Sequence, residues 1–197
     1  MFKNIPCAAG CGNAAVSGSY LCGLHCAEPQ KEASRIAETI LNRTEIRDLN
    51  AGHLRFDSMD FSSKHFSGCD FMESFFNSCV FSGSTMRMVF FDLSVFTDCD
   101  FSNCDMRFLS FGACIFENCK FDSSELIQLN FTGAIITRCS FGHSDLYNSR
   151  FNMAKISMTA IEDCNIENVY FINCEQDNLS FKFSNTKDAF FELEPEN

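Results

Sequence analysis

Four residues near the N-terminus have the types and the spacing of a small metal site. They are Cys7, Cys11, Cys22 and His25, two close pairs separated by a loop of hairpin size. Thiolate and imidazole are ligands that suit zinc, and paired ligands on two short segments are typical of tetrahedral zinc sites. We therefore predict that residues 1–28 form a Cys-rich zinc knuckle. A segment this small has little core, so bound metal would supply its folding energy.

Several alternatives remain open for this segment. Cys26 directly follows His25 and could replace it as the fourth ligand. The cysteines could instead form disulfides, or have no relation to one another. A catalytic zinc is disfavoured, because four candidate ligands leave no open coordination position. The segment resembles short bacterial zinc knuckles that end in Leu-Cys-x-x-His, here Leu21, Cys22 and His25, although three residues rather than four separate its first pair.

A period of five residues organises most of the remaining chain. From Phe56 to Phe181, every fifth residue is large and apolar, and we call these residues the anchors. Of the 26 anchors, 17 are Phe and only Gln176 is polar. An α-helix has a period of 3.6 and a strand a period of 2, so neither explains the pattern. The period therefore indicates a tandem repeat architecture.

The cysteines beyond Cys26 follow the same period. All nine lie two residues before an anchor: Cys69, Cys79, Cys99, Cys104, Cys114, Cys119, Cys139, Cys164 and Cys174. One shared register indicates packing as small buried side chains, whereas disulfides would need pairs placed for each other. The N-terminus lacks the apolar core of a signal peptide, and no apolar run reaches the ~20 residues of a membrane span. We therefore expect a reduced, cytoplasmic protein without a membrane segment.

Anchors twenty residues apart share a size preference. One series consists only of phenylalanine: Phe71, Phe91, Phe111, Phe131, Phe151 and Phe171. Four units of five residues would then make one turn of a square coil, and successive coils would stack. The pattern resembles the pentapeptide-repeat proteins, small-x-Leu/Phe-x-x in tandem. That resemblance implies an all-β solenoid, a right-handed quadrilateral β-helix of about 6.5–7 coils, over residues 46–183.

A solenoid needs its two ends covered. Residues 29–45 predict a capping helix, with Pro29 in its first turn and an apolar face formed by Ile36, Ala37, Ile40 and Leu41. Residues 184–197 form an acidic tail that contains Phe190 and Phe191. Either this tail folds over the last coil or a second copy covers it. The family resemblance favours a homodimer through the C-terminal coil.

Charge and motif content restrict the possible functions. The net charge of −11 argues against direct nucleic-acid binding, which needs a basic patch. Residues 1–53 carry five basic and five acidic residues, so the knuckle also lacks the basic patch of a nucleic-acid-binding module. We therefore favour a capping or protein-docking role for it. None of the four histidines belongs to a recognisable catalytic arrangement, and no Gly-rich phosphate loop is present. We predict a protein that is not an enzyme.

Two outward columns are candidate partner-binding surfaces, because residues just before the anchors should point outward and stack. An acidic column contains Asp105, Glu125 and Asp145, and an apolar column contains Phe75, Val95, Ile115 and Ile135. The acidic column could equally be a solvated face. The apolar column could equally reflect the preference of β-branched residues for stacked strands.

The family resemblance implies one functional hypothesis. Quinolone-resistance members of the family bind DNA gyrase or topoisomerase IV in place of duplex DNA. Residues 54–183 carry 17 acidic and nine basic residues. Over a rod of ~31 Å this gives one net charge per ~4 Å, against one per ~1.7 Å in DNA. Mimicry would therefore be partial, and loop insertions common in that group are missing. The alternative is a scaffold or adaptor that presents the apolar column and the zinc module to a protein partner.

Overall fold

A left-handed corner at every fifth residue converts the repeat into a coil. The computed structural model describes residues 5–192. Every fifth residue from Asp48 to Phe183 has a positive φ, and only three of these corners are glycine: Gly68, Gly83 and Gly133. Each corner ends a short extended segment and turns the chain onto the next face. The large anchor two residues before each corner points inward.

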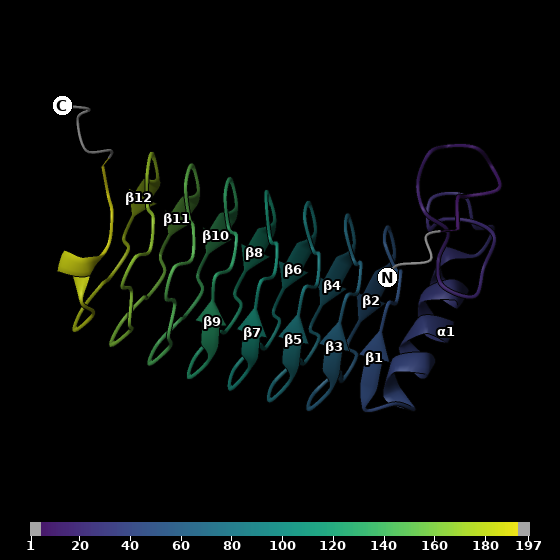
Figure 1. The fold of residues 1–197 in the computed structure, drawn as a ribbon, viewed down its shortest axis with the longest axis horizontal. Helices are drawn as coiled ribbons and strands as arrows, with labels where there is room; N and C mark the ends of the chain where they lie inside the picture. Colours follow the sequence, from purple (N-terminus) through teal and green to yellow (C-terminus); the bar gives the residue numbers. More distant parts are fainter. Residues whose placement is uncertain (1–4, 193–197) are drawn as a thin grey trace.

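One helix and twelve short strands make up the regular structure of the described residues (Figure 1). Helix α1 (Pro29–Leu41) precedes all the strands, and a 3-10 turn, η1 (Thr186–Asp188), follows them. The strands are β1 (Glu45–Arg47), β2 (Arg55–Asp57), β3 (His65–Ser67), β4 (Phe75–Asn77), β5 (Thr85–Arg87), β6 (Val95–Thr97), β7 (Asp105–Arg107), β8 (Ile115–Glu117), β9 (Glu125–Ile127), β10 (Ile135–Thr137), β11 (Lys155–Ser157) and β12 (Glu175–Asp177).

The strands form two parallel sheets on different faces of the coil. One sheet has the order β1-β3-β5-β7-β9, and the other has the order β2-β4-β6-β8-β10-β11-β12. The two remaining faces carry single parallel bridges, one series from Asn50 to Phe190 and one from Asp60 to Ser180. Every partner lies twenty residues further along the chain. The predicted four-sided β-helix of about seven coils is therefore confirmed.

Stacked phenylalanine rings fill the centre of the solenoid. The rings of Phe91 and Phe111 have centroids 5.1 Å apart and planes within 4°. Within a coil, the rings of Phe91 and Phe96 meet edge to face at 5.5 Å. Full burial of one such side chain contributes about 1.5–3 kcal/mol, and the aromatic geometry adds to it. The core is thus a continuous column rather than a set of separate clusters.

The small residues two before the anchors also point inward, and they donate hydrogen bonds to the preceding coil. The Cys114 thiol contacts the carbonyl oxygen of Phe91 at 2.9 Å, and the Ser94 hydroxyl contacts that of Phe71 at 2.9 Å. This explains why both Cys and Ser occupy the position. Of the nine cysteines, eight are buried and Cys174 is half-buried. The prediction that they are packing residues agrees with these positions.

The N-terminal end of the rod is covered by α1 and the Cys-rich segment (Figure 1). Val16 and the buried face of α1 belong to the same apolar core as the first coil. That face consists of Ala33, Ile36, Ala37 and Ile40, whereas Leu41, predicted to share it, is exposed. Within the part of the chain that the structure describes, no helix has the length and apolar character needed to span a bilayer.

The element boundaries differ from the predicted ones at both ends of the solenoid. The capping helix ends at Leu41 rather than at residue 45, and the Lys64 ammonium group binds the carbonyl oxygens of Leu41 and Arg43 at its end. The coil also continues beyond residue 183, since Phe190 pairs with Tyr170. The first part of the predicted tail is therefore solenoid. Residues 193–197 of that tail lie outside the described residues, as do residues 1–4 of the knuckle.

Candidate functional site

Two short segments bring the candidate metal ligands together. A bridge between Pro6 and Ala14 forms a small hairpin, in which the Cys7 amide donates to the carbonyl oxygen of Asn13 at 2.9 Å. A tight turn follows at the second ligand pair, where the His25 amide donates to the carbonyl oxygen of Cys22 at 3.0 Å. The turn places both side chains of this pair on the same side as the hairpin.

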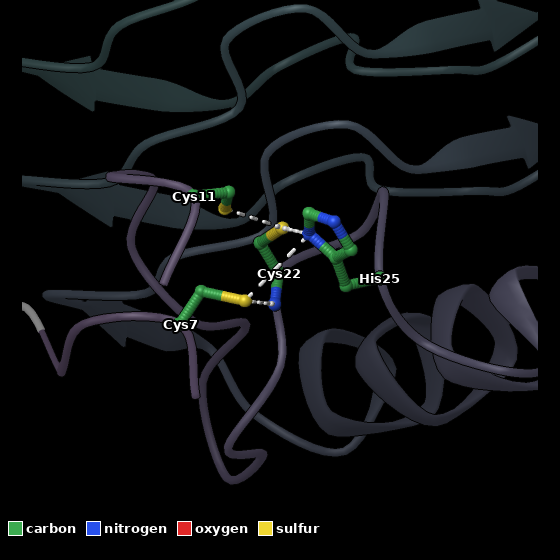
Figure 2. A group of neighbouring side chains, drawn as sticks. All are labelled: Cys7, Cys11, Cys22 and His25. Carbon is green, nitrogen blue, oxygen red and sulfur yellow. Dashed lines mark hydrogen bonds between the residues drawn. The ribbon is translucent and has the colours of Figure 1, made fainter. Parts of the chain in front are cut away.

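The four predicted ligands form one cluster (Figure 2). The ligand atoms of Cys7, Cys11, Cys22 and His25 all lie within 4.8 Å of one another. The Cys11 and Cys22 sulfurs are 3.7 Å apart, and His25 Nδ1 is 3.3 Å and 3.8 Å from the sulfurs of Cys22 and Cys7. A tetrahedral zinc with Zn–S of about 2.3 Å and Zn–N of about 2.05 Å requires edges of about 3.8 and about 3.5 Å. The arrangement therefore fits a single tetrahedral metal ion.

The cluster does not fit the other interpretations of this segment. The 3.7 Å between the Cys11 and Cys22 sulfurs is far beyond the ~2.05 Å of a disulfide. The Cys26 thiol lies outside the cluster and donates to the carbonyl oxygen of Gly23 at 3.1 Å, so the structure does not support Cys26 as fourth ligand. A hydrogen bond from the Cys22 amide lowers the pKa of the Cys7 thiol to about 7, which favours the thiolate that metal binding needs.

The ligand-bearing loop rests directly on the first coil. A Cβ atom placed on Gly23 would lie 2.6 Å from the carbonyl oxygens of both Gly52 and His53. Nearby, the Ser17 amide donates to the carbonyl oxygen of Asn50, and the Ser17 hydroxyl accepts from the Asn50 amide, each at 2.8 Å. The metal cluster is therefore joined to the solenoid through backbone contacts. The sequence predicted a capping role for this segment but not the place of contact, because the only signal for that contact is one glycine between two candidate ligands.

The predicted apolar column exists as a stripe on the outer face of the larger sheet. Strand pairing puts Phe75, Val95, Ile115 and Ile135 in direct register on β4, β6, β8 and β10. The exposed fractions are 48% for Phe75, 40% for Ile115 and 41% for Ile135, and Val95 is half-buried. We call these four residues the apolar stripe. Solitary exposed apolar residues are normal, but a contiguous row is a feature of contact surfaces.

The predicted acidic column also stacks in register, but arginines lie among its carboxylates. Asp105 pairs with Glu125, which pairs with Asp145. Arg87 donates to Asp105, and Arg107 donates to both Asp105 and Glu125. Partial burial alone would raise the pKa of the Asp105 carboxyl, but the two arginines lower it overall. The column is therefore less negative than its carboxylates alone suggest.

Four of the buried cysteines of the solenoid offer little reactivity. Burial raises the pKa of the Cys104 and Cys114 thiols to about 12, and that of Cys69 and Cys164 to about 11. These side chains therefore stay neutral thiols at physiological pH. Neutral thiols are poor nucleophiles and poor metal ligands. Their positions agree with a packing role.

Comparison with protein families explains the solenoid. The family model described as Pentapeptide repeats matches this chain in eight copies, over residues 74–107 and 114–152. Residues 74–107 and 114–152 are pentapeptide repeats. The match covers the centre of the solenoid. No curated protein matches the chain.

Three solved structures are similar to this chain but share little sequence with it. HetL from the cyanobacterium Nostoc sp. strain PCC 7120, which is involved in regulating heterocyst differentiation, is 10% identical; the match covers 80% of this chain and 95% of HetL with a TM-score of 0.33. Full-length QnrB1, a plasmid-mediated fluoroquinolone resistance protein, is 14% identical, with 71% and 90% covered and a TM-score of 0.33. Rfr23 from the cyanobacterium Cyanothece 51142 is 10% identical, with 80% and 98% covered and a TM-score of 0.26.

Proposed function

We propose that this protein is a non-catalytic scaffold or adaptor of the cytoplasm that binds a protein partner through the apolar stripe. The observation that carries the proposal is the register of four apolar side chains on one outer face, three of them at least 40% exposed. Leaving such a row in water costs free energy that a partner would recover on binding. The other outward strand positions of that face are polar, so the stripe would form the core of an interface with a polar rim.

A contrast between two surfaces tests the proposal. Phe75→Ser together with Ile115→Ser should abolish partner binding, because it removes two of the three exposed side chains of the stripe. Charge reversal of Asp105, Glu125 and Asp145 to Lys should leave that binding intact. The measurement is recovery of partners by the purified full-length variants, quantified by mass spectrometry. Unchanged recovery with the double serine variant would remove the stripe from consideration.

A partial DNA mimic that acts on DNA gyrase or topoisomerase IV is the second candidate. The net charge of −11 and the register of Asp105, Glu125 and Asp145 support it. The arginine contacts to two of these carboxylates weigh against it. A supercoiling titration with gyrase, with and without a fluoroquinolone, tests it. Inhibition at low micromolar protein that disappears on charge reversal would favour mimicry over the scaffold.

We propose further that Cys7, Cys11, Cys22 and His25 hold one structural zinc ion. The bound metal would crosslink the hairpin and the following turn, which have almost no apolar core of their own. Four protein ligands leave no position for substrate or water, so the role would be structural. The zinc module would then complete the cap over the first coil. One equivalent of zinc in the purified protein, lost in Cys22→Ser, is the expected result.

A further inference from the structure

We propose that the occupant of the apolar stripe is a basic amphipathic helix of the partner. This inference rests on the proposed function, and it names the secondary structure and the charge of the partner segment. Three features support it: the backbone amides of this face are already paired, the charges around the stripe are mainly negative, and an exposed Leu93 side chain lies close to Val95.

The face that carries the stripe has no backbone groups to offer an added strand. The amides of Val95, Ile115 and Ile135 each donate to the preceding coil, at 2.8–2.9 Å. A partner must therefore dock through side chains. Stripe residues repeat every ~4.8 Å along the rod, close to the 5.4 Å pitch of a helix. An extended segment repeats the side chains on one side only every ~6.8 Å. Its side chains would therefore no longer match the stripe residues after two repeats.

Charges around the stripe favour a basic partner. Each basic residue of this face already contacts a carboxylate: Arg55 with Asp57, Arg138 with Glu117, and Lys155 with Glu175. Among the described residues, Asp98 and Asp177 on the same face contact no Lys or Arg, and accept only from the amide groups of Asn118 and Asn178. The rim of the stripe therefore carries excess negative charge. Lys and Arg beside the apolar face of a helix would complement it.

Leu93 adds exposed apolar surface close to Val95 in the chain, at a conformational cost. It lies two residues before Val95, the smallest residue of the stripe, and its side chain is 54% exposed. Its φ of 63° lies in the left-handed region, which is unfavourable for a large L side chain. Asn, Asp, Ser or Gly occupy 16 of the 28 corners from Asp48 to Phe183, and Met88, Phe108, Met153, Met158 and Phe183 are the other corners with a large apolar side chain. Leu93 is linked to the stripe by its position beside Val95, where an apolar side chain kept in spite of its backbone cost would add to the contact with a partner.

Fluorescence anisotropy with synthetic peptides tests the inference on the full-length protein. The probe is a Leu/Lys peptide of about 18 residues, or about 27 Å as a helix, with Leu at positions i, i+3, i+4 and i+7. Two comparison peptides have the same composition in strict alternation, or Glu in place of Lys. We expect the Leu/Lys helix to bind at least ~10-fold more tightly than either comparison, as a 1.4 kcal/mol difference would give.

Three single variants separate specific docking from general attraction to an acidic protein. Ile115→Ser keeps the net charge and should weaken binding of the Leu/Lys helix about tenfold. Leu93→Asn should also weaken binding, yet raise the melting temperature, because Asn tolerates the left-handed backbone. Phe108→Asn is the matched control: Phe108 also has a positive φ, of 61°, and is 55% exposed, but it lies away from the stripe. This variant should raise the melting temperature and leave binding unchanged.

The outcomes distinguish the helix from the scaffold itself. Equal binding of the alternating or Glu peptide, or binding that ignores Ile115→Ser, would overturn the helical basic occupant. A photo-crosslinking amino acid in place of Phe75 then reports the natural partner segment. Capture of an acidic or extended segment would reject the helix but keep the scaffold. No capture from position 75, together with capture by a crosslinking amino acid placed at Asp105, would reject both.

Discussion

Arg87 donates a hydrogen bond to the carboxylate of Asp105, which lies one coil further along the rod. The two residues are 18 positions apart, so the arginine reaches diagonally across the ladder. Arg107 repeats the contact with Glu125 in the next coil. These ion pairs stabilise neighbouring coils against each other. They also reduce the negative charge that a DNA mimic would need, which is why the apolar stripe is the stronger candidate surface.

The Asp105 pairs predict a specific dependence of stability on pH. The pKa of Asp105 lies below its ordinary value of 3.8 in the folded state. Its stabilising contribution is therefore present above about pH 4 and is lost as the pH falls through the lower, folded-state pKa. The gap in unfolding free energy between the wild-type protein and Asp105→Asn should be constant from pH 7 to pH 5 and shrink below. Urea unfolding at each pH measures it.

A second variant identifies the cause of that gap. In an Arg87→Met background, Asp105→Asn should cost less and its pH dependence should weaken, because one of the two arginine partners is gone. A gap that stays constant down to pH 2 would mean that the arginine contacts are not stabilising.

Removal of the metal should destabilise the N-terminal cap. We expect Cys22→Ser, or exhaustive chelation of the wild-type protein, to lower the melting temperature by several degrees and to increase hydrogen exchange in residues 5–28. Cys26→Ser is the matched control, since its thiol lies outside the cluster, and it should keep one zinc and wild-type stability. Native mass spectrometry gives the metal content. Zinc loss in Cys26→Ser, or none in Cys22→Ser, would contradict the assignment of ligands.

Substitution of Gly23 should weaken the contact between the Cys-rich loop and the first coil. Gly23→Ala inserts a methyl group 2.6 Å from two backbone carbonyl oxygens of the first coil. The loop must then move, at a cost of about 1–3 kcal/mol, and zinc affinity should fall with it. Leu24→Ala, at an adjacent exposed position, is the control and should be neutral. A zinc competition assay and thermal unfolding together measure the effect; parallel behaviour of the two variants would argue against the docking contact.

The C-terminal end predicts self-association. In the described residues, Phe181 is half-buried and Phe191 is 36% exposed, although both rings pack at the end of the core. A second copy would bury them, as the predicted homodimer requires. Sedimentation should give a dimer that Phe191→Glu converts to a monomer. Phe183→Glu, at a corner on the side of the rod, should leave the dimer intact. A wild-type monomer at high concentration would disprove this interface.

Most of the solenoid could be predicted because burial repeats without interruption. One large residue in every five faces the core, so the period of the anchors predicted the coil. The size preference shared by anchors twenty residues apart predicted that each coil has four faces. The same register predicted which residues stack in the apolar stripe. The cluster of Cys7, Cys11, Cys22 and His25 was predictable because these residue types and this spacing are rare in combination.

The remaining features depend on geometry that the period does not contain. The contact between Arg87 and Asp105 follows from the reach of a long side chain across 18 residues, not from the twenty-residue ladder. The choice of His25 over Cys26 depends on the direction of one turn. The end of the solenoid was missed because Thr186 breaks the anchor pattern, although a 3-10 turn carries the chain on to the bridge at Phe190.

The covered N-terminal end allows the rod to fold in the order of its synthesis. The Cys-rich segment and α1 leave the ribosome before the coils, so they can pack with the first coil before later coils exist. Each following stretch of twenty residues then meets a finished ladder, and it has to close only one short loop to join. Folding that adds one coil at a time never exposes more than one growing edge. Each folded coil would thus serve as the template for the next one during synthesis, and the coil added last would always be the least stable.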